Sequence, residues 1–390
     1  MNVENRPSLS VYLHIPFCGV KCSYCAFNTY VHLDHLIAPF VQALCEEIRV
    51  VGGQSTTYDV HTVFLGGGTP SLLTPPQLEC IITALHAHFR IEHDAEITME
   101  SNPADLTREY CTAVRALGIN RLSIGMQSAN ETELRLFDRR HDNETVMRAV
   151  AAARAGGFDN LNLDLIYGAP HQTLETWRET LQEFIALKPE HASLYALSLE
   201  EGTSMKAWVD RGKLPTPDDD LAADMYDLAT EMLEASGYEQ YEISNWTQPG
   251  RACRHNLQYW YNLDYVGLGP GAHGFADAVR YAVIKSPVRY IEALKQPTHS
   301  EFPRTAATDY AEALSRDDII AETLIMNLRL TQAGIDRAQF KKRFGVDLVD
   351  LHREPIERHT RGGLLEVDDA RVRLTDKGRM LSNVVFREFV

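Results

Sequence analysis

Hydrophobic residues in the first half of the chain follow two alternating periods, one typical of strands and one typical of helices. Val11, Leu13 and Ile15 recur at every second position and predict a strand, which stops at Pro16 because proline has no backbone N–H to donate. Further strands are predicted at residues 60–65, 95–100, 121–126, 161–166 and 192–197. Helical periodicity lies between them, at residues 36–51, 75–89, 107–117, 144–155 and 174–187.

Strand and helix units of this length, repeated along residues 1–200, predict a parallel sheet with right-handed crossovers. Six such units fit a partial (β/α)6 barrel, so the expected fold class is α/β. A Rossmann sheet is the alternative, but the glycine fingerprint of dinucleotide binding is missing.

The pattern changes after residue 200. Gly202, Gly212, Pro215 and Pro217 predict a linker over residues 201–218, and the aspartates that follow suit a helix N-terminus. Helical segments are then expected at residues 221–236, 287–294 and 309–328, followed by two short helices, a hairpin at 363–375 and a last helix at 376–389. The sequence therefore predicts a mainly helical C-terminal domain over residues 219–390, whose small hairpin resembles a winged helix, as a cover or docking element.

Composition limits the functions open to this chain. With 390 residues it exceeds one ordinary domain, and 44% apolar with 24% charged residues is typical of a soluble globular protein. The formal net charge of −16 disfavours a nucleic-acid surface and polybasic membrane attachment, but not docking to a protein. No apolar run could span a bilayer and the N-terminus has no apolar signal core, so we expect a cytoplasmic protein. Cys45, Cys80, Cys111 and Cys253 are scattered, which favours a reducing compartment.

Three further cysteines, Cys18, Cys22 and Cys25, follow the first strand with the spacing C-x3-C-x2-C. A structural zinc site is closed by four protein ligands, and an iron–sulfur cluster usually takes four thiolates. Three cysteines can hold a [4Fe–4S] cluster by three irons and leave the fourth iron open for a small molecule. The alternative is a zinc site in which His14 or His32 joins the three cysteines.

Polar residues and glycines stand where the predicted strands end. In parallel barrels the working residues lie at the carboxyl ends of strands, where the loops meet. The candidates chosen by this rule are Gly67, Gly68, Thr69, Glu100, Gln127 and Asp164. Asp164 lies within an apolar strand, and a buried carboxylate is costly unless it is paired or bound to something. We therefore expect these residues to converge on one site.

The cysteine spacing resembles the signature of radical S-adenosylmethionine (SAM) proteins, in which the open iron takes the amino and carboxylate groups of SAM. The segments HIPFC, CSYC, FLGGGTP, LSIGMQS and LDLIYGAP resemble the HemN/HemW branch of that family. The branch contains oxygen-independent coproporphyrinogen III oxidase and haem chaperones. The resemblance runs from about Leu9 to the C-terminus and implies a partial barrel with a [4Fe–4S] cluster on Cys18, Cys22 and Cys25.

The resemblance also implies a set of SAM-binding residues. Gly67, Gly68 and Thr69 match the stretch that holds the SAM amino group, and glycine lets the backbone approach a ligand closely. The other matching positions are Tyr12, Tyr24, Glu100, Gln127, Arg139 and Asp164. Carboxylates suit ribose hydroxyls and an arginine suits a carboxylate. Of the adjacent Arg139 and Arg140, we expect Arg139 in the site and Arg140 in solvent.

The segment HNLQYW, residues 255–260, bears on the choice of function and resembles a segment of HemW-type proteins. Histidine is the commonest haem-iron ligand, and Tyr259 and Trp260 could pack on a flat porphyrin. His255 is therefore a candidate haem ligand, with Cys253 as a rival. The alternative is that His255 is a hydrogen-bonded structural histidine. His273, in the glycine-rich turn VGLGPGAHG expected near the barrel mouth, has no assigned role.

The residue at position 27 distinguishes the oxidase of this branch from the haem chaperones. The oxidase pattern carries a further cysteine two residues after the third, and here that position is Phe27, so the resemblance favours a haem chaperone over the oxidase. We expect a protein that binds the cluster and SAM, carries haem and delivers it to haem-accepting proteins, including those at the membrane. The alternatives are an oxygen-independent coproporphyrinogen III dehydrogenase and a zinc-binding barrel protein. Whether SAM serves as a radical source or as part of a redox gate is left open by the sequence.

Overall fold

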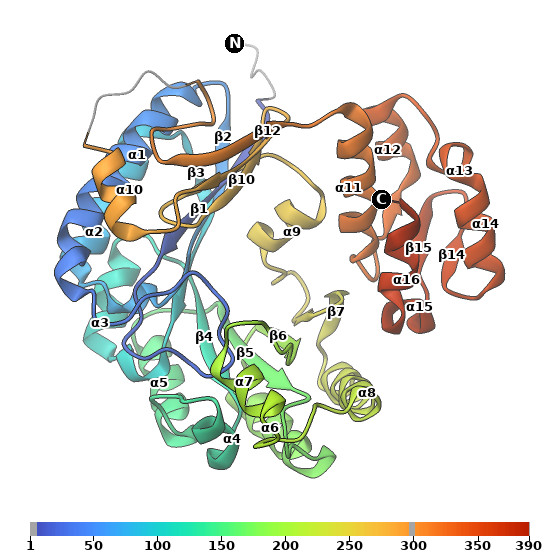
Figure 1. The fold of residues 1–390 in the computed structure, drawn as a ribbon, viewed down its shortest axis with the longest axis horizontal. Coiled ribbons are helices and arrows are strands. Elements are labelled where there is room, and N and C mark those ends of the chain that lie inside the picture. Colours follow the sequence, from blue (N-terminus) through green and yellow to red (C-terminus); the bar gives the residue numbers. More distant parts are fainter. Residues whose placement is uncertain (1–5, 296–300, 390) are drawn as a thin grey trace.

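The computed structural model describes residues 6–295 and 301–389, and its centre is one curved twelve-stranded sheet (Figure 1). Residues 1–5, which belong to the N-terminus expected to lack a signal core, lie outside this range. The strand order is β12-β11-β10-β9-β1-β2-β3-β4-β5-β6-β8-β7. Among the helices described, none is both long and apolar enough to cross a bilayer.

The middle of the sheet is built from six strand–helix units, and strands β1 to β6 pair in parallel in chain order, β1 with β2 through β5 with β6. These elements are β1 (Ser8–Ile15), α1 (Ile37–Gln54), β2 (Asp59–Gly67), α2 (Pro75–His88), β3 (Ile91–Ser101), α3 (Arg108–Ala116), β4 (Arg121–Gln127), α4 (Glu131–Leu136), α5 (Asn143–Ala155), β5 (Leu161–Tyr167), α6 (Leu174–Leu187) and β6 (His191–Ala196). The helices cover the convex side of the sheet (Figure 1). The predicted partial (β/α)6 barrel is therefore confirmed.

Later elements extend this sheet at both edges. They are α7 (Ser204–Asp210), α8 (Asp219–Ala235), β7 (Glu239–Glu242), β8 (Asn245–Thr247), α9 (Arg254–Trp260), β9 (Tyr265–Leu268), β10 (His273–Ala276), β11 (Val279–Val283), α10 (Pro287–Ala293) and β12 (Thr308–Ala313). Strand β8 pairs antiparallel with β6, while β9 pairs in parallel with β1 and carries β10 to β12 beyond it.

This extension differs from the expected organisation of the second half. Strands β7 to β12 belong to the large sheet, and the expected helix over 309–328 is wrong in its first part, where β12 lies. These strands are three to six residues long, which is too short for a period of two to stand out. Helix α11 begins after Ser315, whose side chain accepts a hydrogen bond from the backbone N–H of Asp318.

The last part of the chain forms a separate module with its own core. It contains α11 (Arg316–Leu328), β13 (Ile335–Asp336), α12 (Arg337–Phe344), α13 (Leu348–Leu351), α14 (Arg353–Arg361), β14 (Leu365–Val367), β15 (Arg371–Leu374), α15 (Asp376–Met380) and α16 (Ser382–Phe386). A three-stranded sheet, β13-β15-β14, includes the predicted hairpin. The buried residues of this module form a cluster distinct from that of the large sheet. We therefore propose a domain boundary near residue 314 in place of the expected linker at 201–218.

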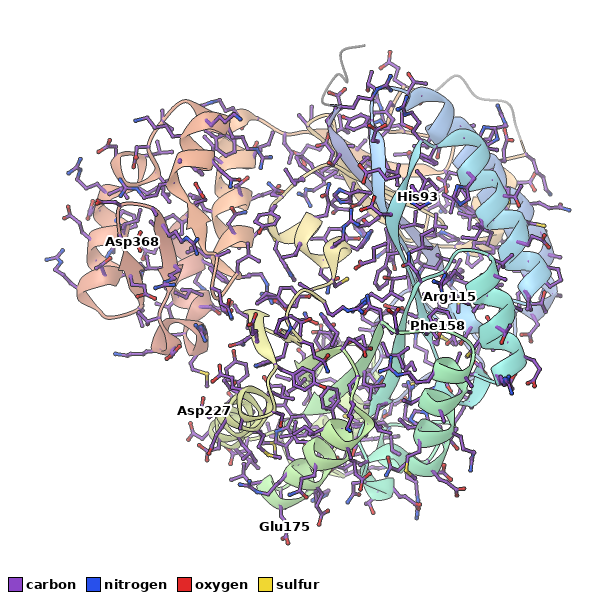
Figure 2. The ribbon with its side chains drawn as sticks, turned by 180° about the vertical axis from the view of Figure 1, so that it is seen from behind. His93, Arg115, Phe158, Glu175, Asp227 and Asp368 are labelled. Carbon is purple, nitrogen blue, oxygen red and sulfur yellow. The ribbon has the colours of Figure 1, made fainter. Side chains whose placement is uncertain are left out.

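Seen from behind, the module around Asp368 stands beside the sheet unit, which is marked by His93 on β3 and Glu175 on α6 (Figure 2). The module is fastened through helix α9 and the turn after it. Asn327 donates a hydrogen bond to the carbonyl of Trp260 at 2.7 Å, and Arg343 donates one to the carbonyl of Asn262 at 2.8 Å.

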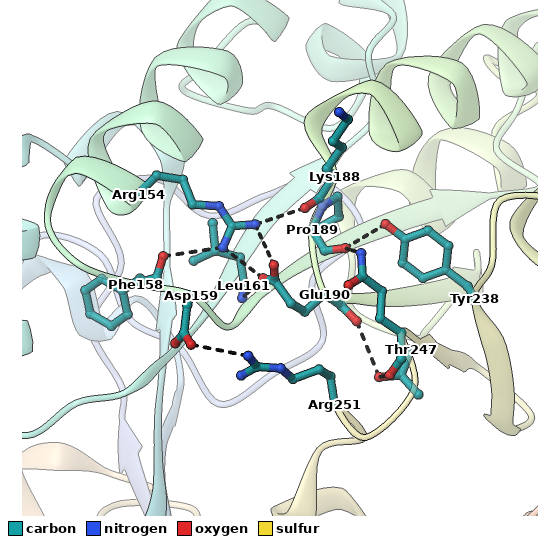
Figure 3. Close-up of polar contacts among 11 residues, drawn as sticks. Arg154, Phe158, Asp159, Leu161, Lys188, Pro189, Glu190, Tyr238, Thr247 and Arg251 are labelled. Carbon is teal, nitrogen blue, oxygen red and sulfur yellow. Dashed lines mark hydrogen bonds and ion pairs between the residues drawn. The ribbon is translucent and has the colours of Figure 1, made fainter.

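At the amino ends of β5 and β6, a polar network fixes the edge of the sheet (Figure 3). The Arg154 guanidinium makes two hydrogen bonds of 2.9 Å to the Glu190 carboxylate, which also accepts from the backbone N–H of Leu161. Tyr238 donates to the carbonyl of Pro189 at 2.6 Å. This end of a parallel barrel serves stability, because the working residues lie at the other end.

Glu47 on α1 ties the glycine-rich turn after β9 to the rest of the sheet unit. Its buried carboxylate accepts hydrogen bonds from the backbone N–H of Gly269 at 2.8 Å, from Tyr290 at 2.7 Å and from Thr305 at 3.0 Å. Burial raises the pKa of Glu47, and the three donors oppose that rise. One side chain thereby joins α1, α10 and the turn between β9 and β10.

Replacing Glu47 by alanine should leave these three buried donors without an acceptor. We expect Glu47→Ala to lower the free energy of unfolding by about 3 kcal/mol, measured by urea denaturation. Glu46→Ala is the matched control, because its neighbour Glu46 forms only an exposed ion pair with Arg49 and should change stability little. Equal effects of the two substitutions would contradict this role of Glu47.

Candidate functional site

The three cysteines lie on a loop whose two ends are held together. The backbone N–H of Cys18 donates to the carbonyl of Tyr30 at 2.9 Å, and the N–H of Tyr30 donates to the carbonyl of Pro16 at 2.7 Å. The loop also contacts helices beyond the first strand, since Ser23 donates to the carbonyl of Leu136 and accepts from the N–H of Met205 on α7. The cysteine loop is therefore anchored at its base and at its middle.

This loop covers one cavity of about 430 Å³ at the carboxyl ends of the strands. The cavity is lined by nearly all of the predicted site residues: Cys18, Cys22, Tyr24, Cys25, Gly67, Gly68, Thr69, Glu100, Gln127, Arg139 and Asp164. Tyr12 and His255 do not line it and face a neighbouring cavity with Glu100 and Asp164. The ends of the strands therefore converge on one cavity, as the sequence predicts.

The thiols have hydrogen-bond donors beside them. Arg139 directs one guanidinium nitrogen to Cys22 Sγ at 3.4 Å and another to the carbonyl of Gly125 at 2.8 Å. The Thr69 hydroxyl lies 3.4 Å from Cys18 Sγ. Burial raises the pKa of the Cys18 and Cys25 thiols, so their thiolates need a strongly cationic partner.

Three free thiols around one cavity, with an arginine next to them, fit a [4Fe–4S] cluster. Among the described residues no fourth cysteine lines this cavity, as a cluster with one open iron requires. Arg140, expected in solvent, is exposed and forms an ion pair with Asp105 at 2.6 Å.

Close backbone packing explains the glycines after β2. Gly67 has a φ of +108°, and a Cβ there would lie 2.5 Å from the His14 ring. A Cβ on Gly68 would lie 2.5 Å from the carbonyl oxygen of Phe17. The N–H of Gly67 is left to donate to Glu100 Oε2 at 2.9 Å. A side chain at Gly67 would collide with His14 on β1, and one at Gly68 would collide with the backbone of Phe17, which leads into the cysteine loop.

Two partly buried carboxylates, Glu100 and Asp164, face the cavity. Burial, with a smaller contribution from Asp164, raises the pKa of Glu100 to about 7. Asp164 accepts hydrogen bonds from Asn162 at 2.8 Å and from Ser123 at 3.2 Å, and burial raises its pKa as well. Their remaining oxygen lone pairs can accept hydrogen bonds from ligand hydroxyl or ammonium groups.

Tyr24 and Gln127 complete the wall. Tyr24 packs edge-on against Phe137 with ring centroids 5.3 Å apart, and burial raises its pKa, so its hydroxyl stays protonated beside Arg139. Gln127 has a φ of +67° at the end of β4. A non-glycine residue in this left-handed region is uncommon and is often associated with a functional site.

His255 differs from the expectation of a haem ligand. Its side chain is 1% exposed, Nδ1 lies 2.8 Å from Thr62 Oγ1, and Nε2 lies 2.9 Å from the Tyr259 hydroxyl. Both ring nitrogens are engaged, so this geometry corresponds to the alternative of a structural histidine. Cys253 is also buried, with Sγ 3.4 Å from Glu96 Oε1, and burial raises its pKa to about 12.

The side chains expected for the alternative zinc site are not arranged as ligands of one metal ion. Both ring nitrogens of His14 are hydrogen-bonded, Nδ1 to Tyr12 at 2.9 Å and Nε2 to the carbonyl of Asn28 at 3.0 Å. Within residues 6–295 and 301–389, no three histidine, cysteine, aspartate or glutamate side chains are grouped to hold a single metal ion.

Sequence reasoning missed residues that support the acids. Ser123 and Asn162 hold Asp164, and Tyr195 at the end of β6 lines both cavities. The strand-end rule applied to β6 could have found Tyr195. The sequence did carry a signal for Asn162. It lies two positions before Asp164 in a buried strand, and residues at alternate positions share one face of the sheet.

Comparisons with known proteins agree with this geometry. Residues 12–184 match the Radical SAM superfamily, and residues 314–381 match the HemN C-terminal domain. A Mycobacterium tuberculosis protein named heme chaperone HemW is 37% identical over 97% of this chain and 93% of its own length. The Bacillus subtilis protein of that name is 32% identical over 98% and 99%. The structure of coproporphyrinogen III oxidase (HemN) from Escherichia coli, described as a radical SAM enzyme, covers 98% of this chain and 90% of its own, with a TM-score of 0.84 and 26% identity.

The fold and the cysteine site define a radical SAM protein, a class that binds SAM and a [4Fe–4S] cluster. The near full-length similarity then gives the narrower assignment. The chain belongs to the HemW family of the radical SAM superfamily.

Glu100 gives a test of the site through pH. Its pKa is raised in the folded state, from a usual value of 4.5 to about 7, so its contribution to stability is full below pH 4.5 and is lost as the pH rises through 7. Glutamine does not ionise, so Glu100→Gln removes this loss of stability at high pH. We expect the free energy of unfolding of the variant to exceed that of wild type by up to about 3 kcal/mol at pH 8.

The measurement is urea denaturation of apo protein between pH 5 and 8, with exposed Glu175→Gln on α6 as control. Glu100→Gln should also weaken SAM binding, measured by calorimetric titration, because the carboxylate that accepts hydrogen bonds from the ligand is lost. A wild-type pH profile in Glu100→Gln would show that Glu100 ionises as it does in solvent.

Proposed function

We propose that this protein is a haem chaperone that carries haem and delivers it to acceptor proteins. In this proposal Cys18, Cys22 and Cys25 hold the [4Fe–4S] cluster and the strand-end residues hold SAM. The relatives named heme chaperone HemW, similar over almost their whole length, support it. So does the charge of the chain, which suits a protein partner better than nucleic acid.

The observation that carries the choice of haem delivery over porphyrinogen oxidation is Phe27. This side chain stands where the oxidase pattern has its further cysteine, and it is 69% exposed on the rim of the cysteine loop. An exposed aromatic ring beside a cofactor site is a surface for a flat apolar ligand or a partner. A thiol at that position could react with substrate, whereas a phenyl ring can only pack.

The candidate site residues have defined tasks in this proposal. The bound cluster would supply an electron and an open iron for the amino and carboxylate groups of SAM. Arg139 offsets the negative charge beside Cys22, and Thr69 donates toward Cys18. Glu100 and Asp164 accept hydrogen bonds from ligand hydroxyls, while Gly67 and Gly68 keep side-chain atoms out of the approach. Tyr24, Gln127 and the more distant Tyr12 complete the surroundings.

The C-terminal module would serve as a docking element for haem acceptors. It is fastened to the sheet through α9, the helix of the HNLQYW segment, so it is placed next to the region that binds ligands.

All seven cysteines are free thiols, which suits the reducing cytoplasm.

A coproporphyrinogen III dehydrogenase is the second candidate, because the Escherichia coli oxidase has the same overall structure. The two functions separate in one assay with anaerobically reconstituted protein. We expect ferric haem to bind and to move to an apo-haemoprotein such as apomyoglobin, while coproporphyrinogen III with SAM and reductant releases no CO2. SAM-dependent CO2 release without haem transfer would replace the chaperone by the dehydrogenase.

The cluster assignment has its own test. Cys22→Ala should abolish the absorbance near 400 nm of the reconstituted protein and its bound iron and sulfide. The stability of the apo protein should change little, because Cys22 is only partly buried. Cys80→Ala, at an exposed cysteine outside the loop, is the control and should keep the cluster. A full complement of iron in Cys22→Ala would exclude the three-cysteine site.

A further inference from the structure

A second cavity, of about 580 Å³, lies on the other side of the cysteine loop from the main cavity. The residues common to the linings of the two cavities are Lys21, Ala26, Phe27 and Thr29. Lys21 directly precedes Cys22 in the chain, and Ala26 directly follows Cys25. One thickness of loop therefore separates the second cavity from the position of the cluster.

The second cavity carries positive charge on a chain that is acidic as a whole. Lys21 and Lys285 line it, both residues are exposed, and neither forms an ion pair with the rest of the described chain. No aspartate or glutamate is among its described lining residues. The formal net charge of the whole chain is −16. Unpaired lysines gathered on such a chain indicate a surface that attracts an acidic partner.

The main cavity has the opposite character. Four carboxylates line it: Glu100, Asp138, Asp164 and Glu200. Two arginines in the same lining are already engaged, Arg139 with Cys22 and Arg140 with a carboxylate outside that lining. An acidic partner therefore meets like charge at the main cavity and opposite charge at the second one.

The wall of the second cavity is held in place by hydrogen bonds of its own. Asn28 in the cysteine loop donates to the carbonyl of Pro270 at 2.8 Å and to that of Lys285 at 3.0 Å. Tyr30 also donates to the Lys285 carbonyl, at 3.2 Å. A Cβ at Gly271 would lie 2.4 Å from Asn28 Nδ2, so the turn packs directly on the loop. The two segments that carry the lysines are thus joined, and the surface is formed in advance of binding.

Aromatic rings lie between and beside the lysines. Phe27 is 69% exposed and stands on the stretch of loop that both cavities share. Tyr259 and Tyr265 line the second cavity and pack edge-on with ring centroids 4.6 Å apart. Aromatic residues are enriched in the centres of protein interfaces, and charged residues lie around them. The composition of this surface is therefore that of a place where another protein binds.

We propose that the second cavity and its rim, with Lys21, Phe27 and Lys285, form the docking surface of a small acidic electron-carrier protein. The inference rests on the proposed function, in which an electron leaves the cluster and has to be replaced. The reduced carrier loses one electron and the cluster gains it, and no bond is made or broken. Transient redox complexes bury little surface, so a patch of this size is sufficient.

The first test follows reduction of the cluster in anaerobically reconstituted protein, with fully reduced flavodoxin as the acidic carrier. Absorbance near 400 nm should fall as the cluster is reduced, and the rate should decrease steeply as salt is added. Lys21→Glu and Lys285→Glu should each slow the reaction by about 10-fold at low salt and by less at high salt. Lys285→Glu leaves the cysteine loop unchanged, so it still tests the surface if Lys21→Glu assembles the cluster poorly.

Two controls separate docking from other effects. Lys377→Glu, at an exposed position of α15, changes the net charge by the same amount and should be reduced as fast as wild type. Dithionite is a small reductant that needs no docking surface, so it should reduce the cluster to the same extent in every variant.

Cross-linking locates the contact without the cluster. In a mixture of apo protein and flavodoxin, a carbodiimide joins lysine amines to the carboxylates that they touch. Peptide mass spectrometry should find links at Lys21 and Lys285 but not at Lys377, and high salt should remove them.

The outcomes separate this docking surface from the function on which it rests. If wild-type protein assembles the cluster and transfers haem, but Lys21→Glu and Lys285→Glu are reduced as fast as wild type, the surface is wrong and the proposed function stands. Equal slowing by Lys377→Glu would also overturn the surface, because the overall charge alone would then explain the rates. If wild-type protein assembles no cluster, the proposed function and the surface fail together.

Discussion

Charge balance at the carboxyl edge of the sheet is the constraint on which the rest of the structure depends. Three thiols and the acids Glu100 and Asp164 face one cavity, and burial raises the pKa of Cys18, Cys25, Glu100 and Asp164. Fixed hydrogen-bond donors offset this effect. Arg139 donates to Cys22, the backbone N–H of Gly67 donates to Glu100, and an amide and a hydroxyl group donate to Asp164. Ligands that bring positive charge suit such a place, and both an iron–sulfur cluster and the sulfonium and ammonium of SAM do so.

The cysteine loop separates two cavities of different character. On one side the lining is rich in thiols and acids, and on the other it is aromatic and basic. The loop is anchored by the backbone pairing of Cys18 with Tyr30 and by contacts of Ser23, so one fixed segment contributes to both cavities. Phe27 reaches both cavities, and at this position a cysteine would favour chemistry on a substrate whereas a phenyl ring favours holding one.

The HNLQYW segment takes a place in the fold that its residues alone did not reveal. Its histidine carries the chemistry of an iron ligand, yet in the fold it is a buried link between Thr62 on β2 and Tyr259 on its own helix. Burial lowers the pKa of His255 to about 3, so it remains neutral and keeps both hydrogen bonds. Tyr259 lines the cavity beside the cysteine loop, and the same helix carries a contact that holds the C-terminal module.

The sequence alone determined the six strand–helix units, the three cysteines and the strand-end residues around them. These follow from local patterns: a period of two that stops at Pro16, glycines that admit close backbone approach, and the common edge at which parallel strands end. Only the tertiary structure decided that β7 to β12 complete the large sheet, because strands this short gain stability from their neighbours and carry little pattern of their own. It also decided the hydrogen bond of His255, since its partner on β2 is 193 residues away along the chain. Hydrogen bonds over such separations exist only after the chain has folded.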